Sequence, residues 1–276
     1  MRLPLVIVAI ISAAAISLLA CSAPSAELLD HPIVDELNEG REAGTEDFDH
    51  SAYEALLEDH VDPDAGTVDY AALADDREQL QSYLDAVDSV DLRELSSDSQ
   101  HALLINIYNA CTLDLILDHY PDIDSIRDIS SPWQTERCHV GGHHLSLDEI
   151  EHNIIRPLYR DPRIHFAVNC AAHDCPHLAD FAYTGDELDS QLAERTEATL
   201  SNEKFARIED GTLRYTRVMH WYSNDFVDEE YHNPAPNLAQ YIARHSTDDI
   251  RQFVEDHDGD PSISPLDYDW SLNDVN

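Results

Sequence analysis

Residues 163–178, RIHFAVNCAAHDCPHL, gather the side chains best able to do chemistry in this chain of 276 residues. The stretch contains two of the five cysteines and three histidines: Cys170, Cys175, His165, His173 and His177. Thiols and imidazoles in such proximity can bind a metal, supply an activated nucleophile, or pair as a disulfide. Each of these possibilities makes a different prediction for the stretch.

A metal site would use Cys170, Cys175 and His165, because thiolate and imidazole are the usual zinc ligands. The two cysteines are separated by four residues, which is the wide end of the spacing in zinc knuckles, and no C-x2-C pair occurs elsewhere in the sequence. We therefore expect no metal and no cofactor, and keep zinc at these three residues as the alternative.

A disulfide is the second possibility. Thiols oxidise outside the cytoplasm, and four cysteines remain if Cys21 carries a lipid, as argued below. Four cysteines allow three pairings, and their proximity in the sequence favours Cys170 with Cys175. This alternative predicts a binding or structural module with a stapled loop. A labile disulfide at the same place would instead indicate a thiol–disulfide redox protein.

An activated thiol is the third possibility. Cys170 follows an apolar run, and at a helix N-terminus the positive end of the dipole would lower its pKa. His152 or His165 can act as the base. Asn106 and Asn109 lie one helical turn apart and can orient that base, hold an oxyanion, or simply bridge to the backbone. This hypothesis predicts acyl transfer or amide hydrolysis with Cys170 as nucleophile, as in papain-like enzymes.

The elements that must position these residues are mostly helical. The stretch 97–121 is apolar on more than one face, which indicates a central buried helix with a capping box at Ser97 and Gln100. A second capping box, at Ser146 and Glu149, opens the helix DEIEHNIIRPLY. This helix carries His152.

Two stretches predict β-hairpins. Residues 138–147 contain a Gly-Gly turn, and residues 205–218 contain Asp210-Gly211 between two strand-like runs. The sequence does not show the alternation of strands and helices that is typical of a parallel sheet. We predict an α+β fold, a helix-rich single domain with short β-hairpins or a small antiparallel sheet, for which a papain-like arrangement is one candidate.

The N-terminus predicts export and lipid attachment. Residues 1–20 combine a short positive start with a long apolar run, as in a signal peptide. The run ends in Leu18-Leu19-Ala20-Cys21, which resembles the lipobox of bacterial lipoproteins and implies cleavage before Cys21 and a lipid on its sulfur. The expected location is the bacterial cell envelope, facing the periplasm or the exterior, with the membrane contacted through this lipid. An uncleaved spanning helix is the alternative.

Polar and acidic residues dominate the next segment. Residues 21–46 are weakly periodic and predict a flexible acidic tether, followed by the domain proper at 47–272.

Charge excludes one class of function. The chain has 56 acidic and 16 basic residues, a formal net charge of −40, and the acidic residues are spread along its whole length. A surface of this kind repels the phosphate backbone, so we expect no nucleic-acid partner. Salt screens such repulsion, which indicates a halophilic, high-salt setting.

Seven segments taken together resemble the domain-of-unknown-function family 547. They run in order along the chain over about residues 47–272: FDHSAYEALLEDHV, VDYAAL, INIYNACTLDLILDHYP, LSLDEIEHNIIR, DPRIHFAVNCAAHDCPHL, HWYSNDF and YDWSLND. The block R-x-H-F-A-x-N-C-A-x-x-x-C-P is the characteristic piece. The sequence departs from the family pattern at Ala172 and Asp174, where serines are usual, and at Leu103-Leu104, where an aromatic pair is usual.

The resemblance ranks residues without naming a reaction. The positions that fit the family pattern are Asn106, Tyr108, Asn109, Glu149, His152, Arg163, His165, Asn169, Cys170, Cys175, Pro176, Trp221 and Tyr222, whereas Cys111 and Cys138 fall outside it. We expect the catalytic group among Cys170 and the histidines, and binding residues among Tyr108, Glu149, Arg163, Asn169 and Trp221. The ligand would be a small molecule or a peptide. A glutaredoxin-like module accompanies the domain in some eukaryotic members, which implies thiol chemistry.

Overall fold

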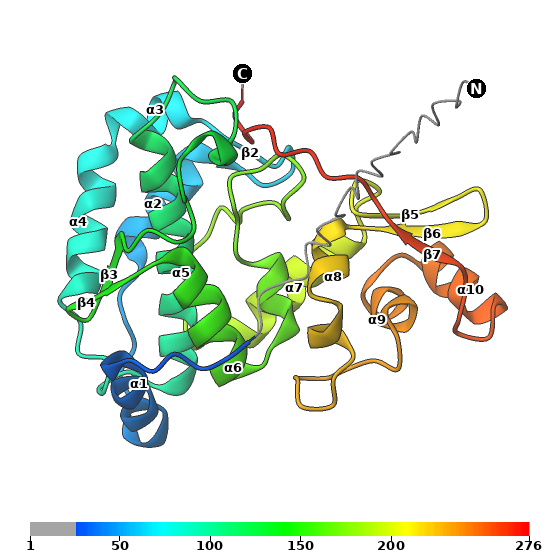
Figure 1. Cartoon of the computed structure of the whole chain (residues 1–276), viewed down its shortest axis with the longest axis horizontal. Coiled ribbons are helices and arrows are strands. Elements are labelled where there is room, and N and C mark those ends of the chain that lie inside the picture. The colour runs from blue at the N-terminus through cyan, green and yellow to red at the C-terminus, as the bar shows by residue number, and fades with distance from the viewer. Residues whose placement is uncertain (1–25, 276) are drawn as a thin grey trace, which may run out of the picture.

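The computed structural model describes residues 26–275, so the predicted signal peptide and Cys21 lie outside the described residues. The chain has two hydrophobic cores, and the elements that build them stand beside each other (Figure 1). The larger is built mainly from helices of the first two thirds of the chain, and the smaller from the last third. The chain is helix-rich with small sheets of two or three strands, which confirms the α+β class.

Helix α5 (Ser97–Leu117) forms the centre of the larger core. All but three of its residues are buried, which confirms the prediction of a central helix. It contacts α1 (Pro32–Ala43), α4 (Arg77–Asp88), α7 (Leu188–Leu200) and β3 (Cys138–Val140). The capping residue is Ser96, one position before the predicted Ser97, and its hydroxyl accepts from the backbone N–H of Ser99.

The structure differs from the expected tether at residues 32–43. These residues form helix α1, which buries Ile33 and Leu37 completely against the larger core. An acidic helix with a single apolar stripe resembles a linker in its composition, because only a few of its residues are apolar. The apolar residues that it does contain are enough to anchor it.

The smaller core packs three helices against a three-stranded sheet. Strands β5 (Ala206–Glu209) and β6 (Thr212–Tyr215) form the predicted hairpin, and Asp210 and Gly211 at its turn have φ of 49° and 71°. Positive φ at both turn residues is the geometry for which this pair is preferred. Strand β7 (Ile263–Pro265) pairs with β6 in parallel, so this sheet is mixed rather than antiparallel. The helices are α8 (Arg217–Trp221), α9 (Leu238–His245) and α10 (Asp248–Asp256).

Short elements complete the chain and supply most of the site. The hairpin of β3 and β4 (His143–Leu145) lies as predicted, with Cys138 opposite Leu145. The other elements are α2 (Ser51–His60), β1 (Val61–Asp62), β2 (Thr67–Val68), α3 (Tyr70–Asp75), η1 (Ile126–Asp128), the π-helix η2 (Glu149–Ile155), α6 (Arg156–Tyr159), η3 (Pro162–Phe166) and η4 (Ser223–Phe226).

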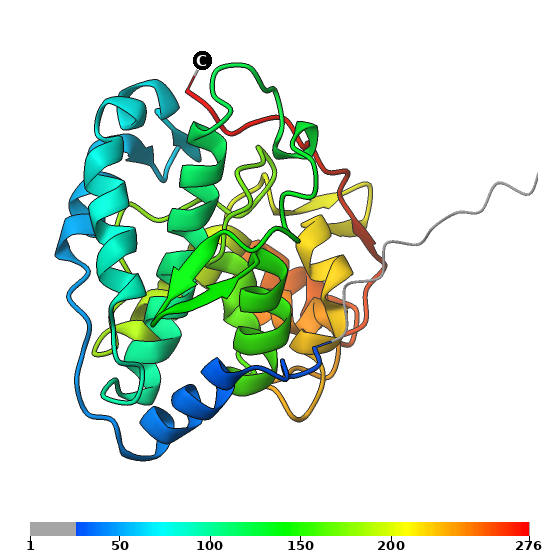
Figure 2. The same cartoon turned by 60° about the vertical axis from the view of Figure 1, so that its left-hand side comes forward.

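The segment after β7 connects the two cores. It leaves the smaller core and runs along the larger one, as Figures 1 and 2 both show. The N–H of Leu272 donates to the carbonyl of Asp124, and the N–H of Val68 donates to the carbonyl of Asn273. We call residues 266–275 the C-terminal strap. Within residues 26–275, no helix is both long enough and apolar enough to cross a membrane.

The disulfide joins Cys111 on α5 to Cys138 on β3, not the predicted pair. Cys170 and Cys175 are free thiols. Proximity in the sequence suggested the wrong pair because α5 and β3 are adjacent only in the folded chain, where the two Cα atoms are 5.8 Å apart. That separation lies inside the usual range for a disulfide.

The disulfide yields a stability prediction. Replacing Cys111 and Cys138 together by alanine should lower the free energy of unfolding by about 3 kcal/mol, because the bond closes a loop with a sequence separation of 27. Urea denaturation measures the loss. Reductant should destabilise the wild-type protein by the same amount and leave the double variant unchanged. Equal stability of the two oxidised proteins would contradict the pairing.

Candidate functional site: a dithiol in an aromatic pocket

A pocket of about 280 Å³ lies where the two cores meet. One side comes from α5, η2 and the loop around the two free cysteines, and the other from α8 and the C-terminal strap. Its lining residues are Tyr108, Trp133, Asp148, Glu151, His152, His165, Val168, Cys170, Cys175, Pro176, Val218, Trp221, Tyr222, Tyr268 and Trp270. Both thiols, both predicted histidines and all three tryptophans of the chain therefore share one cavity.

The strap holds the loop of residues 170–175 in place. Ala172 forms an antiparallel bridge with Leu272, and the N–H of His173 donates to the carbonyl of Ser271 over 2.7 Å. At the start of the loop, the side chain of Asn169 accepts from the N–H of Ala171, whose φ of 58° lies in the left-handed region. A residue with a Cβ adopts this conformation only where the surroundings enforce it. The loop is thus fixed from both sides.

The two thiols of the loop are close together. Their Sγ atoms are 3.2 Å apart, and the backbone N–H of Cys170 donates to Cys175 Sγ over 3.2 Å. The hydroxyl of Tyr268, on the strap, lies 3.3 Å from Cys170 Sγ. Cys175 is buried, whereas Cys170 is partly exposed to the pocket. Cys170 lies in a loop without regular structure rather than at a helix N-terminus, so the predicted source of thiol activation is wrong.

The neighbours of the two thiols shift their pKa values in opposite directions. The pKa of Cys170 is lowered, first because the Cys175 thiol can donate to its thiolate, and then because of Tyr268 and the backbone of Ala172. Burial raises the pKa of Cys175 well above its usual value, and the negative charge of Cys170 raises it further. One sulfur is therefore prepared to attack while the other keeps its proton.

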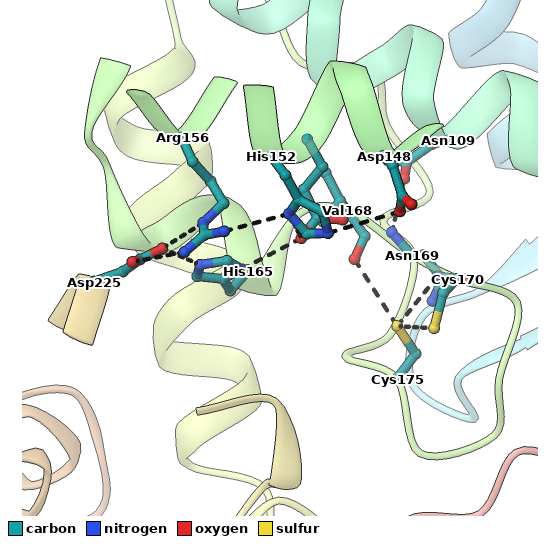
Figure 3. A network of polar contacts seen from close by, with 11 residues as sticks. Asn109, Asp148, His152, Arg156, His165, Val168, Asn169, Cys170, Cys175 and Asp225 are labelled. Atoms are coloured by element: carbon teal, nitrogen blue, oxygen red, sulfur yellow. Dashed lines mark hydrogen bonds and ion pairs between the residues drawn. The ribbon is translucent and has the colours of Figure 1, made fainter. Parts of the chain in front are cut away.

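A buried ion pair lies behind the pocket residue His165 (Figure 3). The carboxylate of Asp225, on η4, accepts from Arg156 over 2.7 and 3.0 Å and from His165 Nε2 over 2.8 Å. These contacts hold the pKa of Asp225 well below its usual range, against the effect of burial. The ring of Tyr222 stacks on His165 with ring centroids 4.0 Å apart.

The protonation of His165 follows from this arrangement. Burial lowers the pKa of His165, so the imidazole is neutral near pH 7. Asp225 accepts the proton at Nε2, which leaves Nδ1 as the basic nitrogen. Nδ1 has no hydrogen-bond partner among the described residues, and Glu151 Oε1 lies 3.8 Å from it.

Glu151 and His152 come from the π-helix η2. The predicted capping box opens it: the hydroxyl of Ser146 donates to Glu149 and also accepts from its backbone N–H. The wider turn of a π-helix is frequent at functional sites. His152 Nδ1 lies 3.4 Å from Arg156 Nη1, and its Nε2 lies 3.8 Å from Asp148 (Figure 3).

The structure brings the predicted catalytic residues together only in part. Cys170, His152 and His165 line the pocket, but no hydrogen bond between residues 26 and 275 joins Cys170 to either histidine. Asn106 binds both backbone groups of Tyr183: its amide donates to the Tyr183 carbonyl and accepts from the Tyr183 N–H. Asn109 bridges Ala167 and Asn169.

Both asparagines therefore serve as buried backbone bridges, and neither lines the pocket. Of the roles considered for Asn106 and Asn109, these contacts agree with the bridge to backbone and give no support to orienting a base or holding an oxyanion. The physical reason is the burial of their amides inside the larger core, where each polar group must find a partner and the nearest ones are backbone groups.

The predicted binding residues divide in the same way. Tyr108 and Trp221 line the pocket, whereas Glu149 caps η2 and Asn169 supports the cysteine loop. Arg163 forms ion pairs with neighbouring aspartates rather than with any pocket residue. Three of the five residues expected to bind a ligand are thus positioning residues.

The proposed zinc ligands do not converge. Among residues 26–275, no group of three or more His, Cys, Asp or Glu side chains has the geometry of a metal site. Cys170 and Cys175 lie together, but His165 faces Asp225 and Glu151.

The sequence alone did not reveal several residues that line the pocket or support its walls. Asp225, Arg156 and Glu151 come from elements that meet only in the folded chain, and nothing in their local sequence separates them from the many other charged residues. Trp270 and Tyr268 stand in the YDWSLND segment, whose two aromatic residues in an acidic stretch were a usable signal. Trp133 gave no comparable signal.

One family model matches part of the chain. Residues 92–199 match the model of the family described as "Protein of unknown function, DUF547". The matched segment contains α5, η2 and the cysteine loop, and it ends before Asp225 and the strap. No curated protein and no solved structure gives a significant match to the chain.

Alkylation tests the difference between the two thiols. Iodoacetamide should modify Cys170 faster than Cys175, and the rate should rise with pH through an apparent pKa below that of free cysteine, because only the thiolate reacts. Peptide mass mapping after timed quenching measures both rates.

A matched variant identifies the cause of this reactivity. Tyr268→Phe removes the hydroxyl beside Cys170 Sγ and should move the apparent pKa of Cys170 upward. Equal reaction rates at the two cysteines, or an apparent pKa at or above that of free cysteine, would contradict the arrangement.

Proposed function

We propose that the protein carries out thiol–disulfide exchange, with Cys170 as the attacking thiol and Cys175 as the resolving thiol. The observation that carries this proposal is the separation of 3.2 Å between two free sulfurs whose pKa values are shifted in opposite directions. Cys170 is the partly exposed member of the pair, as an attacking thiol must be.

The exchange has two balanced steps. The Cys170 thiolate attacks one sulfur of a substrate disulfide, the substrate S–S bond breaks, and the other substrate sulfur leaves as a thiolate. Cys175 then loses its proton and attacks Cys170 Sγ, which releases the second substrate thiolate and forms the Cys170–Cys175 disulfide. Two electrons pass from the protein dithiol to the substrate disulfide. The same steps in reverse oxidise a substrate dithiol.

The neighbours of Cys175 explain the order of these steps. The charge on Cys170 is one cause that keeps the pKa of Cys175 high. Once Cys170 is part of a mixed disulfide, that charge is gone, and Cys175 loses its proton more easily. The first step therefore prepares the second.

Acyl transfer or amide hydrolysis is the second candidate. It is favoured by one observation, the neutral His165 that Asp225 holds with Nδ1 free, in the wall of the same pocket. It lacks a hydrogen bond between thiol and base and an oxyanion hole built from Asn106 or Asn109. It also leaves Cys175 without a role.

Serine substitutions distinguish the two candidates. Thiol–disulfide exchange predicts that Cys170→Ser abolishes the reduction of a small disulfide by the pre-reduced protein. It also predicts that Cys175→Ser stops the reaction at a mixed disulfide on Cys170, which mass spectrometry detects. Acyl transfer predicts instead that Cys175→Ser keeps full turnover of an activated ester.

A control checks that the effect belongs to the pocket. The variant lacking Cys111 and Cys138 loses two sulfurs elsewhere and should retain the exchange rate under conditions where it is folded. The proposal would be refuted if the wild-type dithiol reduced no small disulfide although far-UV circular dichroism showed the protein to be folded.

We propose in addition that the protein is a lipoprotein of the cell envelope in a high-salt organism. The support is the Leu18-Leu19-Ala20-Cys21 motif after an apolar run, together with a net charge of −40. Through the lipid on Cys21 the domain would work at the membrane surface, where disulfides and dithiols are exchanged outside the reducing cytoplasm.

Cys21→Ser tests the anchor. The full chain expressed in a bacterium should sediment with membranes and give an N-terminal peptide whose mass includes a diacylglycerol on Cys21. The variant should lack this added mass and should no longer sediment with membranes. An intact segment 1–20 in the wild-type protein would favour the uncleaved helix and contradict lipidation.

A further inference from the structure

Aromatic rings form one wall of the pocket. Trp221 on α8 packs with Tyr268 and Trp270 of the strap, with ring centroids 4.8 and 5.6 Å away, and Tyr268 lies 4.6 Å from Trp270. Trp133 meets Trp270 edge to face. Such rings attract organic cations through their negative faces, and a guanidinium is the cation that stacks on them best. Arg127 already lies 5.2 Å from the centroid of the Trp270 ring.

The other wall presents hydrogen-bond acceptors. Glu151 and Asp148 line it with carboxylates, and His165 adds the lone pair of Nδ1, which is buried and has no hydrogen-bond partner among the described residues. Glu151 Oε1 and His165 Nδ1 are both acceptors and lie 3.8 Å apart. Neither can satisfy the other, so His165 Nδ1 lacks an N–H donor.

Charge points to the same ligand. No lysine or arginine belongs to the lining of this pocket, and the nearby charge of Arg156 is matched by Asp225. The lining thus holds two carboxylates, Glu151 and Asp148, and no lysine or arginine, although Glu151 also interacts electrostatically with Arg156 behind it. A volume of about 280 Å³ admits a group of side-chain size.

We propose that the pocket binds an alkylguanidinium group, as at the end of an arginine side chain. Its plane would stack on the wall of Trp221, Tyr268 and Trp270, and its N–H groups would donate to Glu151 and to His165 Nδ1. This deepens the proposed function, on which the substrate claim rests: the exchanged disulfide would belong to a peptide that carries arginine beside its cysteine.

Binding of the guanidinium group can be measured in a variant that cannot perform thiol–disulfide exchange. The Cys170→Ser protein cannot perform the exchange, and its three tryptophans all line the pocket, so intrinsic fluorescence reports on this cavity. Titration with methylguanidinium at constant ionic strength should give a saturable change. Methylurea, which has nearly the same shape and no charge, should bind at least about tenfold more weakly.

Two carboxylate variants locate the site. Glu151→Gln should weaken methylguanidinium binding by about tenfold or more, whereas Glu58→Gln, an exposed carboxylate of α2, should leave it unchanged. Far-UV circular dichroism checks the folding of both. If Glu151→Gln does not fold, Asp148→Asn replaces it. Absence of saturable binding, or equal binding of methylurea, would overturn the proposal.

A comparison of two peptide disulfides tests the proposed preference for arginine in the substrate. The wild-type dithiol should reduce a peptide disulfide with arginine next to cysteine faster than the same peptide with citrulline there. Guanidinium binding without any exchange would refute the proposed function and leave the pocket as a cation site. Exchange at equal rates on both peptides, without methylguanidinium binding, would refute the cation site and leave the dithiol.

Discussion

The buried carboxylate of Asp225 is the interaction on which the arrangement of the site depends. It lies on η4 of the smaller core and is bound by Arg156 of α6 and by His165 of η3, which come about 60 to 70 residues earlier in the chain. A buried ion pair stabilises little by itself, but removing one partner costs about 3–5 kcal/mol because the other charge is left buried. Salt cannot screen it as it screens the acidic surface. The two cores, and hence the two walls of the pocket, are held in register by this contact.

The pocket thus combines functional groups from three segments that are distant in the sequence. The cysteine loop places two sulfurs side by side, the strap supplies the hydroxyl of Tyr268 that favours the thiolate of Cys170, and η2 supplies Glu151. The strap has a double role, because it fixes the loop through backbone hydrogen bonds and also contributes the aromatic wall. Two thiols, an aromatic surface and hydrogen-bond acceptors thus line the same cavity.

The sequence predicts the parts of this structure that depend on local patterns. The central helix, both hairpins and the capping box of Ser146 and Glu149 follow from periodicity, turn residues and cap chemistry, which neighbours in the sequence determine. The importance of the segment around Cys170 was also evident from its residue types. Helix α1 was missed because its few buried apolar residues are hidden in an acidic composition.

What the sequence does not predict depends on contacts between distant segments. The disulfide joins Cys111 to Cys138 because α5 packs against β3, and no local rule gives that packing. The partners of Asn106 and Asn109 are backbone groups of later loops, and Asp225 is one of many similar acidic residues until the fold selects it.

The central claim is that Cys170 and Cys175 form a working dithiol. Equilibration of the protein against mixtures of reduced and oxidised glutathione, followed by acid quenching and peptide mass mapping, tests it most directly. The account predicts that a Cys170–Cys175 disulfide forms and disappears reversibly across these mixtures, while the Cys111–Cys138 disulfide persists. Sulfurs that stay reduced in every mixture, or that only take up glutathione separately, would contradict it.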